Sequence, residues 1–357
     1  MAKERILEWD YLKGILIIFI IFGHTSASLG AFEKDNILSY FSSFTVSFIM
    51  PLFLIITGYF IYSENCTFVE YLMKKMKRMI VPAIKWGIIG GIITSIILIF
   101  KGNYSLIAIC KNFYWNIQYL WYLYAVFVCA IIVFAIEFVL NIIDKGRFIS
   151  ILLYVFVAIL LLFVPTDKWN INFSFGFIMI GRLLRKFKFS LNWFYENRTI
   201  CGLLSIVYFV SLVFFSYEYS VYIEGTNIIT NLPVTKHIII VLFRFLVGIL
   251  GGISISFISL EIYGYINHGN HFYLTIIKKQ LEKLGKYCME MYCVQFVVVE
   301  RLFKIIIDIF FSKNIMFTSN PYLCYFVWRN LFGLVLCYIT YKIVKWLKSA
   351  NINNIVF

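Results

Sequence analysis

Long, unbroken runs of apolar residues make up most of the chain, and short polar segments separate them. An α-helix needs about twenty apolar residues to cross the hydrocarbon core of a bilayer, whereas membrane β-strands read as short alternating segments. The pattern therefore predicts an all-α, polytopic transmembrane helical bundle of about ten spans. The candidate spans lie at about 12–30, 41–62, 80–100, 119–140, 149–164, 171–187, 200–216, 237–259, 287–311 and 322–346.

The number of basic residues between the runs alternates from one connection to the next. The connection with Lys74, Lys75, Lys77 and Arg78 is rich in Lys and Arg, and the connections on either side hold only one or two lysines. Because positively charged loops stay in the cytoplasm, we expect an even number of spans with both termini cytoplasmic. The longest loop, roughly 260–286, is too short for a domain of its own. The chain 1–357 is thus expected to be a single membrane-embedded domain without a soluble appendage.

Composition agrees with a chain embedded in a membrane. Hydrophobic residues make up 62% of the 357 residues and charged residues only 14%, too few to cover a soluble domain of this apolar content. The net charge of +14 follows from the basic loops, so we expect membrane lipids and not nucleic acid as partners. The cysteines form no CxxC pair, and His268 and His271 lack a nearby carboxylate, so neither a disulfide framework nor a metal site is predicted. Abundant Ile, Lys, Asn, Tyr and Phe indicate a bacterial protein, and hence the bacterial cytoplasmic membrane.

Ionisable residues inside a membrane are costly, which makes them candidates for function. Lys13 and His24 are almost three whole helical turns apart, so both side chains lie on one face of the first span. Asp10 lies within about 40° of the same line. The histidine lies about 16 Å deeper than the lysine, where a neutral imidazole can act as a general base. The alternative is a structural histidine that hydrogen-bonds a neighbouring helix, and the residues leave both interpretations open.

Five segments, in order along the chain, carry a resemblance to a known family. The first is the run from Arg5 to His24, in which a basic residue, here Lys13, is followed by ten residues and then histidine. The others are Pro51–Tyr59 (P-x-F-F-x-x-S-G-Y), Lys74–Pro82 (K-x-x-R-x-x-x-P), Leu120–Leu123 (L-W-F-L) and Leu284–Gln295 (L-G-x-x-S-x-x-I-Y-L-x-H). On these segments the chain resembles the type-three integral-membrane acyltransferases, which attach acyl groups to cell-surface glycans. The resemblance covers nearly the whole chain.

The resemblance implies an acyl-CoA-dependent O-acyltransferase whose single acyltransferase domain is the whole chain. An acyl group, acetyl first and succinyl as the alternative, would pass from coenzyme A to a hydroxyl of a surface polysaccharide or its lipid-linked precursor, without a metal. His24 would deprotonate the acceptor or carry the acyl group itself, and Asp10 would orient or balance Lys13. The residues expected to bind are Arg78, Lys77 and Lys74 for the phosphates of acetyl-CoA, and Glu290, Gln295, Arg301 and Trp121 for the substrate.

The last motif departs from the family at positions that matter for chemistry. Gln295 stands where the family often has histidine, and Glu290 stands where it often has serine. An amide cannot take a proton, so a second base at Gln295 is excluded. Glu290 or Glu300 can substitute for it. For Glu300 we favour the alternative of an ion pair with Arg301 or Lys304.

Two other classes of protein compete with an acyltransferase. A transporter or flippase for a glycan or lipid-linked intermediate fits the ten spans and the intramembrane Arg and Glu, but the chain shows no internal repeat. A glycan polymerase would need large outside loops with arginines, and the expected outside loops are short and contain none. Acyl transfer is therefore the function that the sequence favours.

Overall fold

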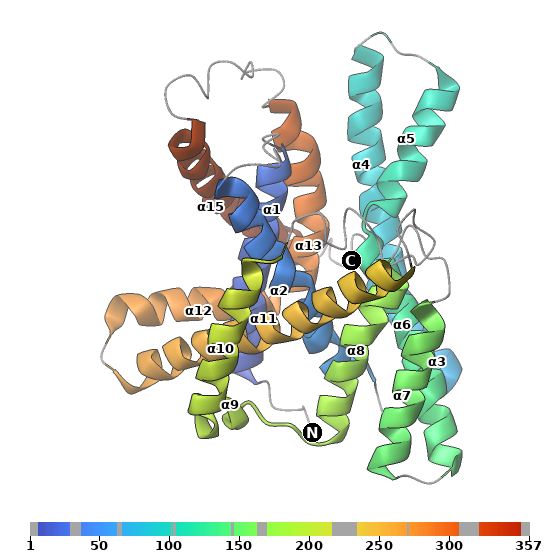
Figure 1. The fold of residues 1–357 in the computed structure, drawn as a ribbon. Helices are drawn as coiled ribbons and strands as arrows, with labels where there is room; N and C mark the ends of the chain where they lie inside the picture. Colours follow the sequence, from blue (N-terminus) through green and yellow to red (C-terminus); the bar gives the residue numbers. More distant parts are fainter. Residues whose placement is uncertain are drawn as a thin grey trace. The chain divides into compact units, whose positions relative to one another are not determined.

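The computed structural model describes residues 6–28, 37–62, 66–100, 102, 105–143, 146–162, 170–215, 234–269, 271–306 and 321–350, with only the helical backbone for 26–28, 37–42, 234–237 and 321–329. Every regular element in these ranges is a helix, as the hydrophobic pattern predicts (Figure 1). The helices are α1 (Leu7–Ser28), α2 (Ile37–Ile61), α3 (Phe68–Lys75), the π-helix η1 (Met76–Ile80), α4 (Val81–Phe100), α5 (Leu106–Gln118), α6 (Trp121–Ile143), α7 (Arg147–Leu162), α8 (Ile171–Lys186), α9 (Asn192–Glu196), α10 (Arg198–Leu212), α11 (Val234–His268), α12 (Phe272–Lys286), α13 (Cys288–Val297), the π-helix η3 (Val298–Phe303) and α15 (Pro321–Ser349).

Five helical segments in these ranges are long and apolar enough to cross a membrane. They are Ser43–Ile61, Phe68–Phe100, Trp121–Ile143, Ile238–His268 and Asn330–Ser349. Helices α7 and α10 are shorter but apolar, and α10 exposes Leu203, Ile206 and Val207 as a lipid-facing helix does. The described helices thus fit a polytopic membrane bundle, while the count of ten spans and the cytoplasmic termini stay predictions.

Local sequence explains how α3 begins and why η1 separates it from α4. Thr67 caps α3, because its Oγ1 accepts the N–H of Glu70 at 3.3 Å and the Glu70 carboxylate accepts the N–H of Thr67 at 3.0 Å. Pro82 lacks an N–H, and its ring clashes with the carbonyl four residues earlier, so the preceding turn cannot close as an α-helix. The backbone widens there into the π-helix η1.

The chain forms two compact units, and the first comprises Met1–Ser42, Ile80–Leu120 and Asn270–Phe357. In this unit α1 packs against α12, α13, η3 and α15, while α4 packs against α5 and α13 (Figure 1). Helix α12 crosses α1 at Gly14 and Gly285. A Cβ on Gly14 would overlap the backbone of Leu281, and a Cβ on Gly285 would overlap the backbone of Asp10. Only glycine permits so close an approach, and this crossing fixes α12 against the polar end of α1.

The second unit comprises Ser43–Met79 and Trp121–Gly269. Helix α6 packs against α3, α7 and α8, and α10 packs against α11. Tyr208, Phe215, Val247 and Leu250 form a buried apolar cluster where α10 meets α11. The hydroxyls of Ser47 and Tyr208 share a hydrogen bond of 2.7 Å, which joins α2 to α10.

The prediction of a long loop at roughly 260–286 is wrong, because most of this segment is helical. Helix α11 continues to His268, and α12 follows at Phe272. Helix α12 is amphipathic: Leu281 contacts α1, whereas Lys279 and Lys283 are exposed. A helix with one charged face has a low mean hydropathy, so a search for apolar runs passes over it.

Candidate active site

Helix α1 carries the three residues that the sequence predicts for catalysis. Asp10 is buried, and its Oδ1 lies 2.7 Å from the Nζ of Lys13, so the carboxylate balances the lysine as expected. The Sγ of Cys288, the first residue of α13, donates to the carbonyl oxygen of Lys13 at 3.7 Å. His24 lies on the same helix, towards its opposite end.

The imidazole of His24 contacts a buried carboxylate from the far end of the sequence. Its Nδ1 forms an ion pair with the Oε1 of Glu300, whose side chain is only 8% exposed. The hydroxyl of Tyr119 donates to the other carboxylate oxygen, Oε2, at 2.6 Å. Glu300 lies in η3, and π-helices are frequent at functional sites because the wider turn redirects side chains. Three segments of the first unit thus meet at one carboxylate.

Glu300 corrects one interpretation of the sequence. We favoured an ion pair between Glu300 and Arg301 or Lys304, but the carboxylate contacts His24 and Tyr119. Arg301 points elsewhere: its Nε donates to the Oδ1 of Asn116 at 2.9 Å. Neighbouring residues on a helix diverge by about 100°, so Glu300 and Arg301 face different partners.

Arg301 forms the wall beside the cluster. Its guanidinium lies 4.8 Å from the ring centres of both Tyr119 and Phe296, and these two rings stack at 5.0 Å. Asn116 is buried, and its amide nitrogen donates to the carbonyl of Asn112 at 2.8 Å. The arginine therefore holds the ring of Tyr119 in place, and the tyrosine in turn holds the carboxylate.

This arrangement defines the chemistry of which the imidazole is capable. A carboxylate at Nδ1 favours the proton on that nitrogen, so Nε2 keeps its lone pair and can accept a proton. The side chain of His24 is 26% exposed, whereas that of Glu300 is 8% exposed, so another molecule can reach the imidazole while the carboxylate stays shielded. A base oriented by a buried acid is the arrangement that nucleophilic acyl transfer uses.

The four residues expected around the substrate differ in their surroundings. Glu290 is half-buried and forms an ion pair with Lys348, whose ammonium also lies 4.4 Å from the ring centre of Tyr287. Gln295 is 1% exposed, and its Oε1 has no hydrogen-bond partner among the described residues. Arg301 adjoins the His24 cluster as described above. Trp121 begins α6 in the second unit, so its place beside the substrate stays a prediction.

Three basic residues predicted to bind coenzyme A lie in the second unit. Lys74 lies in the last turn of α3, and Lys77 and Arg78 lie in η1. All three side chains are exposed, and no ion pair engages them in the part of the chain that the structure describes. They form a group of cations that is open to an anionic ligand, and their role stays a prediction.

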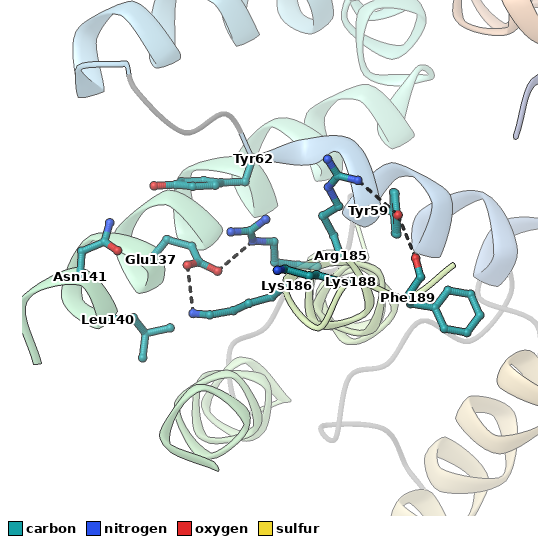
Figure 2. Close-up of a pocket in the computed structure, with 10 residues that line it drawn as sticks. Tyr59, Tyr62, Glu137, Leu140, Asn141, Arg185, Lys186, Lys188 and Phe189 are labelled. Atoms are coloured by element: carbon teal, nitrogen blue, oxygen red, sulfur yellow. Dashed lines mark hydrogen bonds and ion pairs between the residues drawn. The ribbon is translucent and has the colours of Figure 1, made fainter. Parts of the chain in front are cut away.

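A further buried carboxylate, Glu137 of α6, went unrecognised in the sequence. Its Oε1 accepts from the Nε of Arg182 and from the hydroxyl of Tyr154, both at 2.8 Å. Its Oε2 accepts from Lys186 at 3.2 Å (Figure 2). The signal was present, because Glu137 is a lone acid within the apolar run 121–143. Arg182 is 5% exposed within α8.

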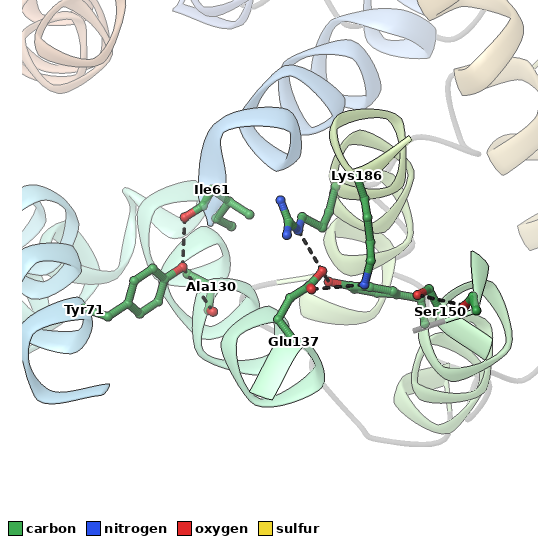
Figure 3. Close-up of polar contacts among 9 residues, drawn as sticks. Ile61, Tyr71, Ala130, Glu137, Ser150 and Lys186 are labelled. Atoms are coloured by element: carbon green, nitrogen blue, oxygen red, sulfur yellow. Dashed lines mark hydrogen bonds and ion pairs between the residues drawn. The ribbon is translucent and has the colours of Figure 1, made fainter. Parts of the chain in front are cut away.

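Tyr71 closes the same region of the second unit. Its hydroxyl donates to the carbonyl of Ile61 at 2.9 Å and lies 3.4 Å from that of Ala130, which ties α3 to the end of α2 and to α6 (Figure 3). Tyr71 is 1% exposed, so these contacts are shielded from solvent. The neighbourhood of Glu137 is therefore built from five helices of one unit, namely α2, α3, α6, α7 and α8.

Fold and site together define a helical membrane protein in which a histidine contacts a buried glutamate. The acyltransferase 3 family model, described as an acyltransferase domain, matches residues 6–342, nearly the whole chain. The chain therefore belongs to the acyltransferase 3 family and is a multi-pass membrane acyltransferase. No curated protein and no solved structure matches it.

Proposed function

We propose that the protein transfers an acyl group from coenzyme A to a hydroxyl of a cell-surface polysaccharide or of its lipid-linked precursor, with His24 as the base. The observation that carries the proposal is the contact between His24 Nδ1 and the buried Glu300 carboxylate. A purely structural histidine needs no such partner. Burying a carboxylate is costly unless a permanent counter-ion offsets its charge, so a carboxylate buried against a histidine favours a functional role. Family membership supports acyl transfer as the reaction.

In the proposed reaction each proton transfer and each bond change can be assigned to His24, the acceptor hydroxyl or coenzyme A. His24 Nε2 takes the proton from the acceptor hydroxyl as its oxygen attacks the thioester carbonyl. The carbon–sulfur bond then breaks, the new ester forms, and the imidazolium returns the proton to the departing thiolate of coenzyme A. Glu300 stabilises the transient imidazolium, and Tyr119 keeps the carboxylate pointed at Nδ1.

The donor and acceptor are inferred from charge and from the family. Lys74, Lys77 and Arg78 present exposed cations suited to the phosphates of coenzyme A, and acetyl is the acyl group we favour over succinyl. The unpartnered oxygen of the buried Gln295 is suited to accept a hydrogen bond from an acceptor hydroxyl. No step in this scheme calls for a metal. We place the protein in the bacterial cytoplasmic membrane.

The test is turnover of radiolabelled acetyl-CoA by the purified protein, with wild type compared to His24→Ala and His268→Ala. We expect His24→Ala to lower label transfer or hydrolysis by about 10³-fold while coenzyme A binding persists. His268 is an exposed histidine at the end of α11, so His268→Ala serves as the matched control and should retain activity. If the wild type does not bind coenzyme A, the proposal is overturned and a glycan transporter becomes the favoured function.

A further inference from the structure

A cavity of about 700 Å³ lies within the second unit, where α2, α6 and α8 end. We propose that this cavity is a binding site for a phosphate-bearing ligand, either water-soluble or the headgroup of a lipid. Its lining contains four basic side chains and one carboxylate, together with two tyrosines (Figure 2). The ten lining residues are Tyr59, Tyr62, Glu137, Leu140, Asn141, Arg182, Arg185, Lys186, Lys188 and Phe189.

The charges in the lining do not cancel. Glu137 is already engaged by the Nε of Arg182 at 2.8 Å and by Lys186 at 3.2 Å. Arg185 and Lys188 have no carboxylate partner among the described residues. An excess of positive charge around a partly closed cavity is unfavourable unless an anion offsets it.

Arg185 is held in a position suited to an oxyanion. Its guanidinium lies 5.2 Å from the ring centre of Tyr59, and its Nη1 donates to the Tyr59 hydroxyl at 3.3 Å. That hydroxyl in turn donates to the carbonyl of Phe189 at 3.0 Å. One face and one edge of the guanidinium are thus fixed by protein, and the remaining N–H groups are available for a planar, two-point contact with phosphate.

Lys188 occupies a backbone position that lysine disfavours. The end of α8 has the hydrogen bonds of a Schellman motif, from the N–H of Lys188 to the Arg185 carbonyl at 3.1 Å and from the N–H of Phe189 to the Leu184 carbonyl at 2.9 Å. The motif puts Lys188 at φ 59°, a left-handed conformation that glycine adopts freely and that is unfavourable for other residues. The local fold alone favours glycine here, whereas the cavity gains a cation from lysine.

A basic loop that only sets membrane orientation would look different. Such residues are exposed and need no cavity, whereas here Arg182 is buried and Arg185 and Lys186 are half-buried. The volume falls within the range of roughly 300–1,000 Å³ typical of small-molecule sites. Leu140 and the two tyrosines supply an apolar wall, which suits a ligand with an organic part beside its phosphate.

The experiment is thermal unfolding of the full-length protein in detergent, with two probes of the same chemistry. Inorganic pyrophosphate tests a soluble phosphate, and micelles with phosphatidylglycerol, compared with phosphatidylcholine, test a lipid phosphate. Lys188→Gly removes the cation and relieves the backbone, so the protein should fold at least as well as wild type. Lys188→Arg keeps the charge, and Lys279→Gln removes an exposed lysine of the first unit as the matched control.

One result supports a soluble ligand. The affinity for pyrophosphate, derived from the thermal stabilisation, is about tenfold lower in Lys188→Gly but is kept in Lys188→Arg and Lys279→Gln. The same pattern with phosphatidylglycerol alone supports a lipid. Arg185→Gln should reproduce the loss by a second route. Absence of stabilisation by either probe in wild type, or equal stabilisation of Lys188→Gly, overturns the proposal. The readout is binding and not turnover, so it holds equally in His24→Ala, and its outcome is separate from that of the acyl-transfer proposal.

Discussion

Two of the buried carboxylates in the described part of the chain, Glu137 in the second unit and Glu300 in the first, have partners that differ in kind. Glu137 in the second unit forms ion pairs with a guanidinium, that of Arg182, and with an ammonium, that of Lys186. Glu300 in the first unit faces an imidazole and a phenol, which change protonation state or carry no charge.

The difference separates a structural pair from a chemical one. A carboxylate whose partners are already cations forms a stabilising ion pair. An arginine or lysine that is already a cation cannot accept a further proton. A carboxylate set against imidazole orients the ring and can stabilise the imidazolium that forms during proton transfer. Exchange of the carboxylate for its amide should therefore give opposite signatures at the two positions: lost turnover at Glu300 and lost stability at Glu137.

Glu300→Gln gives the largest expected effect. The amide can donate to Nδ1, which moves the histidine proton to Nε2 and removes the base. We expect kcat to fall by about 10³-fold, equivalent to about 4 kcal/mol, with little change in the KM for the thioester. Steady-state kinetics on purified protein would measure both. A comparable kcat in the variant would mean that Glu300 serves packing only.

Glu137→Gln should act on stability. It leaves Arg182 and Lys186 without their counter-ion in a buried setting, which costs about 3 kcal/mol in the free energy of unfolding. Unfolding in detergent measures this cost, and turnover per folded molecule should stay near wild type. Glu70→Gln, which alters an exposed carboxylate at the cap of α3, is the matched control with a small expected loss, because glutamine can also accept the N–H of Thr67. Equal losses in the two variants would contradict the structural role of Glu137.

Tyr119→Phe gives the smallest expected effect and refines the comparison. The change removes the hydroxyl at 2.6 Å from Glu300 but keeps the ring between Phe296 and Arg301. We expect kcat to fall about tenfold because the carboxylate is less well oriented. Tyr154→Phe makes the same change beside Glu137 and should leave kcat unaltered. A fall in kcat of similar size for Tyr154→Phe would remove the distinction between the two clusters.

Much of the fold follows from the sequence because a bilayer imposes strong rules. Each apolar run that we assigned as a span contains a helix, and α4 and α6 begin within two residues of the expected positions. The pairing of Asp10 with Lys13 follows from their spacing of one helical turn. Amphipathic helices such as α5 and α12 carry no such signal, because their apolar face is diluted by polar residues.

Only part of the site can be predicted from the sequence. His24 is visible because it is a lone histidine in an apolar run near Lys13. Its partner is not, since the sequence does not tell which residues of distant helices meet. A wider π-turn at η3 also changes the direction of Glu300 from that of a regular helix. Glu137 had a readable signal as a lone acid in a span, but its three partners come from α7 and α8 and required the structure.

The residues that pack around α1 lie far from it in the sequence, and this separation has a consequence for biosynthesis. Lys13 and Cys288, which hold α1 against α13, are 275 residues apart, and Tyr119 and Glu300 are 181 residues apart. At about 5–20 residues per second, a ribosome finishes α1 roughly 15–55 s before it makes α13. During this interval the first helix waits in the membrane with its lysine neutralised by Asp10 and its histidine without an acid. A nascent or prematurely terminated chain therefore lacks the contact between His24 and Glu300 until α13 and η3 have been inserted.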